Sequence, residues 1–338
     1  MLLSALVALL LVTAAGCSSD ADEAAPSSSA PASSRTGADS STTTASSAAR
    51  SSQGCGRDPD APRLTSEGAG DAELTFAVDS EGGTTPSRTY RLGVPDAYDP
   101  DEPAPLILNL HGSGSDAIQQ SIYSDLPRQA GERGFITVTP DAIEGKWQLT
   151  PDGADDEFLT ALVDDVEGRY CVDLNRVHVA GISLGAWKAS LVGCNHPDRY
   201  ASMALVAEEV HPPNCPPMPV IAFHGTADRT VPYGDGADEG VQVTGSNADL
   251  PGARKNVADW AEAGGCAKEP DITDLGDDVV KWNYPECDEG VSVQLYTVKG
   301  GGHTWPGSKI EIGPTTQTID ATQLILDFFE GHPARTDN

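Results

Sequence analysis

Apolar runs that suit buried strands alternate with segments of helical spacing from residue 55 onward. Eight runs predict strands: Leu74–Val78, Arg88–Val94, Leu106–Leu110, Phe135–Thr139, Val177–Ile182, Met203–Ala207, Val220–Phe223 and Val293–Val298. Five segments predict helices: Leu126–Arg133, Asp156–Tyr170, Leu184–Cys194, Ala253–Ala263 and Ala321–Phe329. This alternation predicts an α/β fold, with one mainly parallel twisted sheet and helices on both of its faces.

The first 53 residues have a different character. Met1–Gly16 is almost wholly apolar and is followed at once by Cys17, which predicts a signal peptide over residues 1–17 and resembles the lipidation signal of bacterial lipoproteins. An ordinary secretory signal is the alternative. Residues 18–53 are rich in Ser, Ala and Thr and contain too few large apolar side chains to form a core. We therefore expect a disordered linker there. One folded domain is expected over residues 54–334.

Charge narrows the classes of partner. The 338 residues include 51 acids and 21 bases, a net charge of −30. Such a chain does not suit nucleic acid, nor an anionic membrane bound through a basic face. No internal apolar run is long enough to span a bilayer, so we expect membrane contact only through a lipid on Cys17. A monomer that is secreted, or held on the bacterial membrane as a lipoprotein, is expected.

Six cysteines remain beyond Cys17, and an even number in an exported chain predicts three disulfides. Two pairs flank local polar insertions, which leaves a third pair for the start of the domain. The expected pairs are Cys266–Cys287, Cys194–Cys215 and Cys55–Cys171. No CxxC pair or His/Cys cluster has the spacing of a zinc site, so a metal site is not expected.

The pentapeptide Gly181-Ile182-Ser183-Leu184-Gly185 has the form G-x-S-x-G. The motif alone recurs by chance, but here a predicted strand enters it and a predicted helix leaves it. In that setting the glycines allow a sharp turn that lifts the serine hydroxyl above the edge of the sheet. Ser183 is therefore the candidate nucleophile, and a capping serine in a plain turn is the alternative.

A serine nucleophile needs a base, and the base needs an acid to orient it. Of the seven histidines, His303 stands out because it follows the glycine turn 300–302 after a predicted strand. Asp228 follows the strand Val220–Phe223 and belongs to the same edge. The chain order Ser183, Asp228, His303 is that of α/β-hydrolases. A loop histidine and a turn aspartate are the alternatives.

The tetrahedral intermediate of acyl transfer also needs hydrogen-bond donors for its oxyanion. One expected donor is the backbone N–H of Leu184, the residue after the nucleophile. The other is expected from the loop His111-Gly112-Ser113-Gly114, which follows the buried strand Leu106–Leu110. Within it we favour the N–H of Ser113, then that of Gly112; an ordinary strand-ending turn is the alternative.

Together these segments resemble carbohydrate esterase family 1, in the branch of secreted proteins like polyhydroxybutyrate depolymerases and feruloyl esterases. HGTADRTVPY (224–233) and GGGHTWPG (300–307) are the most specific stretches. The resemblance implies an α/β-hydrolase fold, with Ser183 as nucleophile, Asp228 as acid and His303 as base. It also implies hydrolysis of carboxylic esters outside the cell without a cofactor. The chain departs from the pattern at Ala186-Trp187, and at Glu208-Glu209, where the family more often has a neutral Ala-Gly pair.

These features predict an extracellular serine esterase acting on feruloyl esters of plant polysaccharide or on polyhydroxyalkanoate-type polyesters. Aromatic side chains near the active edge are candidates for stacking on an aryl ester or a polymer: Trp305 first, then Trp187 and Trp147. Two other classes stay open. One is a serine peptidase of the prolyl-oligopeptidase type, which the lack of a propeller-sized N-terminal region disfavours. The other is an inactive binding lipoprotein, which a complete Ser/Asp/His set disfavours.

Overall fold

The computed structural model describes residues 49–59, 72–77, 79–80, 83–84, 87–234, 241–242 and 249–334. The expected signal peptide, Cys17 and nearly all of the expected linker lie outside the described residues, and so they stay predictions.

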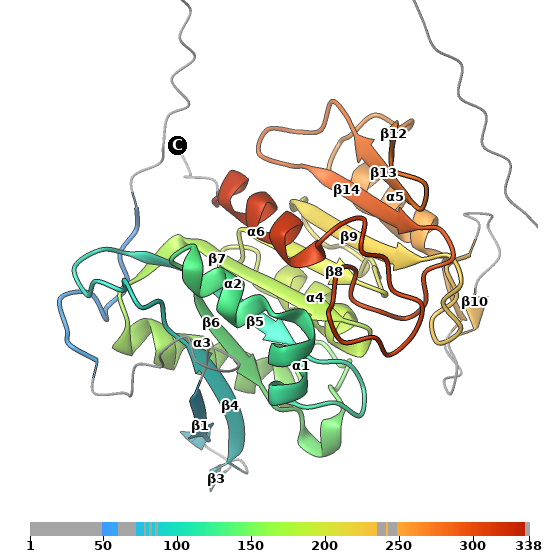
Figure 1. Cartoon of the computed structure of the whole chain (residues 1–338). Helices are drawn as coiled ribbons and strands as arrows, with labels where there is room; N and C mark the ends of the chain where they lie inside the picture. Colours follow the sequence, from blue (N-terminus) through green and yellow to red (C-terminus); the bar gives the residue numbers. More distant parts are fainter. Residues whose placement is uncertain are drawn as a thin grey trace, which may run out of the picture. The chain divides into compact units, whose positions relative to one another are not determined.

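The described residues form one ten-stranded sheet (Figure 1). Its strands are β1 (Ala72–Phe76), β4 (Arg88–Gly93), β5 (Ala104–Leu110), β6 (Ile136–Pro140), β7 (Val172–Ile182), β8 (Ser202–Val206), β9 (Val220–Gly225), β12 (Asp271–Leu275), β13 (Val279–Tyr284) and β14 (Val293–Val298). The spatial order is β1-β4-β6-β5-β7-β8-β9-β14-β13-β12. The strands from β6 to β14 are mutually parallel, and an antiparallel pair extends each end. Two small hairpins pair β2 (Asp79–Ser80) with β3 (Gly83–Thr84) and β10 (Val241–Gln242) with β11 (Asp249–Leu250).

Helices cover both faces of the sheet, as the alternation of elements predicts. They are α1 (Ala117–Ser124), α2 (Leu126–Glu132), α3 (Ala154–Arg169), α4 (Leu184–Asn195), α5 (Ala253–Ala263) and α6 (Ala321–Gly331), with a short 3-10 turn, η1 (Ile143–Gly145). Leu106 and Leu108 of β5 point into the core shared with α3, α4 and α5. Ile107 between them points into the other core, shared with α2 and α6. A strand that is covered on both faces buries successive side chains, which explains the nearly continuous apolar run of β5.

All eight expected strands and all five expected helices are present, with ends shifted by a few residues. Sequence reasoning missed α1 and the hairpin β12–β13. Strand β12 reads Asp-Ile-Thr-Asp-Leu, and nearly all of it is exposed, so it lacks the apolar run that marks a buried strand. Helix α1 leaves Ile118 and Ile122 exposed, so its apolar positions do not mark a core-facing stripe.

The register of the parallel strands aligns their carboxyl ends. Ile182 of β7 pairs with Val206 of β8, which pairs with Phe223 of β9, and Phe223 pairs with Tyr296 of β14. Leu110 of β5 pairs with Gly181 of β7. The loops that follow these strands therefore emerge along one edge of the sheet, where ligands of open α/β folds bind.

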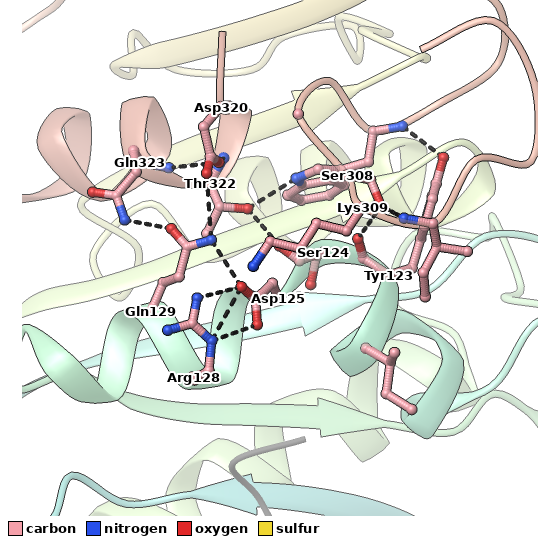
Figure 2. Close-up of a pocket in the computed structure, with 14 residues that line it drawn as sticks. Tyr123, Ser124, Asp125, Arg128, Gln129, Ser308, Lys309, Asp320, Thr322 and Gln323 are labelled. Atoms are coloured by element: carbon pink, nitrogen blue, oxygen red, sulfur yellow. Dashed lines mark hydrogen bonds and ion pairs between the residues drawn. The ribbon is translucent and has the colours of Figure 1, made fainter. Parts of the chain in front are cut away.

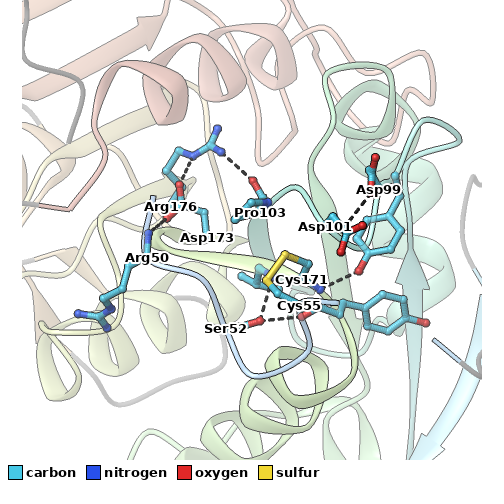
Figure 3. The surroundings of a disulfide bond; sticks show 12 residues. Arg50, Ser52, Cys55, Asp99, Asp101, Pro103, Cys171, Asp173 and Arg176 are labelled. Atoms are coloured by element: carbon cyan, nitrogen blue, oxygen red, sulfur yellow. Dashed lines mark hydrogen bonds and ion pairs between the residues drawn. A yellow bond between two sulfur atoms is a disulfide. The ribbon is translucent and has the colours of Figure 1, made fainter. Parts of the chain in front are cut away.

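The three expected disulfides are confirmed: Cys55–Cys171, Cys194–Cys215 and Cys266–Cys287. The first ties the start of the domain to the amino end of β7 (Figure 3). Around it, Ser52 donates its backbone N–H to Val172 and its hydroxyl to the carbonyl of Tyr170, at 2.9 and 2.7 Å. Gly54 lies so close to Tyr170 that a Cβ would be 2.2 Å from its carbonyl oxygen. The segment 50–55 is thus fastened at the sheet edge opposite Ser183.

Candidate active site

Ser183 occupies a strained turn between β7 and α4. Its φ is 56° and its ψ is −130°, a conformation that residues with a Cβ rarely adopt. Glycine on both sides makes the turn possible. A Cβ on Gly181 would be 2.4 Å from the carbonyl of Gly185, and a Cβ on Gly185 would be 2.3 Å from the carbonyl oxygen of Leu110. The motif glycines are therefore required because backbones touch there, and Ser183 is held by its N–H, which donates to Val206 at 2.8 Å.

The loop after β5 lies against Ser183. A Cβ on Gly112 would be 3.4 Å from the Cβ of Ser183. The buried His111 clamps this loop, because its Nε2 accepts the N–H of Ala142 at 3.0 Å and its Nδ1 lies 2.8 Å from the carbonyl of Gly112. Burial lowers the pKa of His111, which suits a neutral ring that donates from one nitrogen and accepts at the other.

Backbone N–H groups of this region differ in whether they are free. Gly114 donates its N–H to the carbonyl of Gly145 at 2.8 Å, so it is engaged. The N–H groups of Gly112, Ser113 and Leu184 have no backbone acceptor among the described residues. Gly112 therefore lies beside the nucleophile, and the expected oxyanion donors keep their N–H groups free of backbone acceptors in the described part of the chain.

Asp228 and His303 are brought together by two interlaced loops. Ala227 donates its N–H to Gly301 at 2.8 Å, Thr226 donates to Val298 at 2.9 Å, and the hydroxyl of Thr226 accepts the N–H of Gly300 at 2.8 Å. His303 Nδ1 then lies 2.7 Å from Asp228 Oδ2. The loops after β9 and β14 therefore behave as one support for the pair.

The Asp228 carboxylate is fixed on both oxygens. Oδ1 accepts the N–H groups of Thr230 and Val231 at 2.8 and 3.0 Å, while Oδ2 serves His303. Burial by itself would raise the pKa of Asp228, but its bonds to His224 and His303 outweigh burial and hold the pKa well below its usual range. The carboxylate is ionised and accepts a proton-bearing Nδ1, which leaves Nε2 of His303 as an acceptor. Within the described residues, Ser183 Oγ makes no hydrogen bond to that ring.

Sequence reasoning missed the environment of His224. Its Nδ1 lies 2.8 and 3.0 Å from the two carboxylate oxygens of Glu209, and its Nε2 lies 2.9 Å from the carbonyl of Val231 and 3.4 Å from Asp228 Oδ2. Burial alone would lower the pKa of His224, but Glu209 and Asp228 outweigh it and raise the pKa to about 10. A buried acid directly after a buried strand needs a partner, and that was the signal available at Glu208-Glu209.

Glu208 is the second acid of that pair, and its side chain is only 4% exposed. Its Oε1 has no hydrogen-bond partner among the described residues. Burial raises the pKa of Glu208 to about 8, with repulsion from Glu209 adding to the effect. Glu208 therefore lies close enough to Glu209 and Asp228 for their charges to favour its protonated form.

Trp305 and Trp147 are buried, so the expectation that they offer stacking surfaces is wrong. Trp305 is 1% exposed and donates its indole N–H to Thr322 Oγ1 at 2.9 Å. Trp147 is 3% exposed and donates to the carbonyl of His111 at 2.9 Å. Both rings are therefore packed inside the protein, where neither can stack on a substrate. Trp187 alone of the three is partly exposed.

A pocket of about 350 Å³ lies beside the loop that follows His303 (Figure 2). Its walls come from α1, α2, α6 and residues 305–310, and they do not include Ser183, Asp228 or His303. Its polar groups bond mainly to one another: Arg128 to Asp125, Gln129 to Asp125 and Asp320, and Thr322 to Ser124. The pocket is thus distinct from the reacting groups.

No group of three or more His, Cys, Asp or Glu side chains is arranged to hold a metal ion in residues 49–334 as described. No helix in the same residues combines the length and apolar character needed to cross a bilayer.

Known proteins of similar sequence are esterases by name. Feruloyl esterase B of Piromyces equi is 31% identical over 224 residues, which are 62% of this chain and 41% of that protein. NocK of Nocardia uniformis subsp. tsuyamanensis, an esterase by name, is 29% identical over 275 residues, or 72% of this chain and 80% of that protein. Feruloyl esterase C of Emericella nidulans is 27% identical over 195 residues, or 55% of this chain and 65% of that protein. The chain therefore spans less than two thirds of the length of both feruloyl esterases.

Solved structures agree on the fold. Acetyl xylan esterase from Aspergillus awamori superposes with a TM-score of 0.54 at 14% identity, over 77% of this chain and 99% of that one. A thermostable esterase superposes with a TM-score of 0.51 at 16% identity, over 77% of this chain and 63% of that one. No protein-family model matches the chain. The chain is therefore similar in sequence to proteins named feruloyl esterase, and its fold is that of the α/β-hydrolases.

Proposed function

We propose that the protein is a serine hydrolase of carboxylic esters. The observation that carries the proposal is the 2.7 Å bond between His303 Nδ1 and Asp228 Oδ2, on loops that leave the same sheet edge as Ser183. Fold alone does not assign an activity. The sequence relatives are esterases by name, which supports the proposed activity independently of the fold.

In this proposal, Ser183 attacks the ester carbonyl while Nε2 of His303 accepts its proton. His303 then protonates the leaving alcohol, and water releases the acyl group by the same steps in reverse order. Asp228 holds the imidazole in the tautomer that presents an acceptor to Ser183. The strained φ of Ser183 is the feature that exposes a nucleophile at a strand-to-helix turn.

The free N–H groups of Leu184 and of the 112–113 segment are proposed to bind the oxyanion. Donors that are already in place lose little free energy on reorganisation when charge develops, and removing one costs about 2.7–4 kcal/mol of transition-state stabilisation. The contacts of the His111 ring support this role, because they fix the loop and do not occupy the N–H groups of Gly112 or Ser113.

Hydroxycinnamoyl esters of plant polysaccharide are the proposed substrate class. Feruloyl esterases recur among the relatives. Another relative, from Neocallimastix patriciarum, is named a bifunctional acetylxylan esterase/xylanase. Trp187, three residues past Leu184 in the first turn of α4, is the remaining candidate for stacking on an aryl group. Polyhydroxyalkanoates stay the competing substrate.

An exported enzyme is proposed, because three disulfides suit an oxidising compartment. Retention on the membrane through a lipid on Cys17 is part of the same proposal and rests on the sequence of the first 17 residues.

The test is hydrolysis of p-nitrophenyl acetate by the purified protein and by Ser183→Ala. We expect turnover in the first and almost none in the second. Methyl ferulate and polyhydroxybutyrate granules then compare the two substrate classes, and a prolyl peptide substrate tests the peptidase alternative. Equal hydrolysis by Ser183→Ala would contradict the mechanism.

A further inference from the structure

His224 is sandwiched between hydrogen-bond acceptors. Its Nδ1 faces the carboxylate of Glu209 at 2.8 Å, and its Nε2 faces the carbonyl of Val231 at 2.9 Å. A neutral imidazole has one N–H only, so it would leave one nitrogen lone pair against an acceptor. Against a Glu209 carboxylate and the Val231 carbonyl, only the imidazolium donates a hydrogen bond on both sides.

The same ring is in contact with the acid of the proposed triad. His224 Nε2 lies 3.4 Å from Asp228 Oδ2, and that oxygen is the one bonded to His303. All three side chains, Glu209, His224 and Asp228, are about 99% buried or more, so solvent screens their charges little.

Resting on the proposed function, we propose that His224 is a positioning residue: a buried cation, paired with Glu209, that keeps Asp228 ionised and directed at His303. The series of side-chain contacts Glu209–His224–Asp228–His303 thus extends the triad by two residues. His224 touches neither the ester nor Ser183 and acts only through Asp228.

The cation changes how strongly Asp228 supports the charged form of His303. An unopposed carboxylate stabilises the neighbouring imidazolium fully, whereas a carboxylate shared with a second cation stabilises it less. His303 must be neutral to accept the proton of Ser183. The presence of His224 therefore keeps the base available at lower pH.

Other titratable groups surround His224, and they enter the charge balance. They are Glu208 and Glu209 after β8, Asp228 and Tyr233 after β9, and His303 after β14, which reaches it through Asp228. Burial raises the pKa of Tyr233 to about 12, so that ring stays neutral. Glu209 is the counter-charge that lets the cation be buried.

The first experiment measures the pH profile of kcat/KM for His224→Gln. Loss of the cation should move the acid limb upward by about one pH unit. The matched control is His178→Gln, which replaces an equally buried histidine that bonds Ser202 and stacks on Phe329, roughly 16 Å down β7 from Ser183. The control should lose stability and keep the limb in place. A folded His224→Gln protein with an unmoved limb would overturn the proposal.

The second experiment needs neither a variant nor turnover. NMR of ¹⁵N-histidine-labelled protein should show both nitrogens of His224 protonated near neutral pH, in the wild type and in Ser183→Ala alike. A neutral His224 ring would overturn the proposal even if the esterase is active. If the protein has no esterase activity at all, the proposed function fails, while the state of the His224 ring still decides whether a buried cation faces Asp228.

Discussion

Gly185 packs directly against Leu110, the last residue of β5: a Cβ on Gly185 would be 2.3 Å from the Leu110 carbonyl oxygen. This contact joins the helix that follows the nucleophile to the loop that carries the proposed oxyanion donors. The spacing between Ser183 and Gly112 therefore depends on a backbone contact, with no side chain between.

Gly185→Ala should disturb this spacing. The methyl group has to displace backbone, so we expect a loss of about 1–3 kcal/mol in the free energy of unfolding and a fall in kcat. Urea unfolding and ester hydrolysis measure the two effects. Gly168→Ala in α3 is the control, since a Cβ there has nothing within 4 Å and should stabilise the helix by about 0.5–1 kcal/mol. Full activity in Gly185→Ala would show that the contact is not needed.

Substitutions in the triad should differ in severity. Ser183→Ala and His303→Ala should each reduce kcat roughly 10⁶-fold, and Asp228→Asn should reduce it roughly 10⁴-fold, because the amide alters the tautomer of His303. Steady-state kinetics with circular dichroism as a folding control measures this. Asp228→Asn should also lose stability, since it disturbs the pairing of His224. A wild-type rate in any of the three would be inconsistent with the assigned roles.

Glu208 should make stability fall as the pH rises. Its pKa is about 8 in the folded protein against 4.5 in a free side chain, so between these values the unfolded state binds fewer protons than the folded state. The free energy of unfolding then decreases with pH across that window. Glu208→Gln should flatten this dependence and be more stable than wild type near pH 8. Chemical denaturation at a series of pH values is the measurement; parallel curves would contradict it.

A disulfide that closes a long loop should stabilise the protein more than one that closes a short loop. Cys55–Cys171 closes 116 residues of sequence and Cys194–Cys215 closes 21. Chain entropy then predicts that removing the first, by paired Cys→Ala changes, costs about 1.5 kcal/mol more than removing the second. Because the first bridge lies at the edge opposite Ser183, kcat should stay unchanged. Thermal unfolding and hydrolysis assays compare the variants, and an equal or reversed order of stability would argue against loop entropy.

Cys17→Ser should change where the protein is found. If Cys17 carries acyl chains, each buried CH₂ contributes about 0.8 kcal/mol to membrane binding, and the wild type needs detergent for release. The variant should be released or stay as an uncleaved precursor. Fractionation of expressing cells measures this. A wild type that is wholly soluble in the medium and begins after residue 17 would support an ordinary secretory signal.

The sequence by itself determined the fold class, the eight expected strands, the disulfide pairs and the order of Ser183, Asp228 and His303. These depend on local signals: apolar runs, glycine turns and motif spacing. It could not determine which aromatic rings are exposed, and the tertiary structure places Trp147 and Trp305 in the interior. Nor could it find β12, whose polar residues form a strand only because β13 supplies the hydrogen bonds.

Only the tertiary structure decided the state of the groups beside Asp228. Glu209 follows β8, whereas His224 lies in β9 and Asp228 in the loop after it, and no local sequence pattern indicates the charge of any of the three. Their ionisation depends on burial and on distances of about 3 Å between side chains that the parallel register brings to one edge. Such distances are not encoded in spacing along the chain, because they arise from the packing of whole strands against one another.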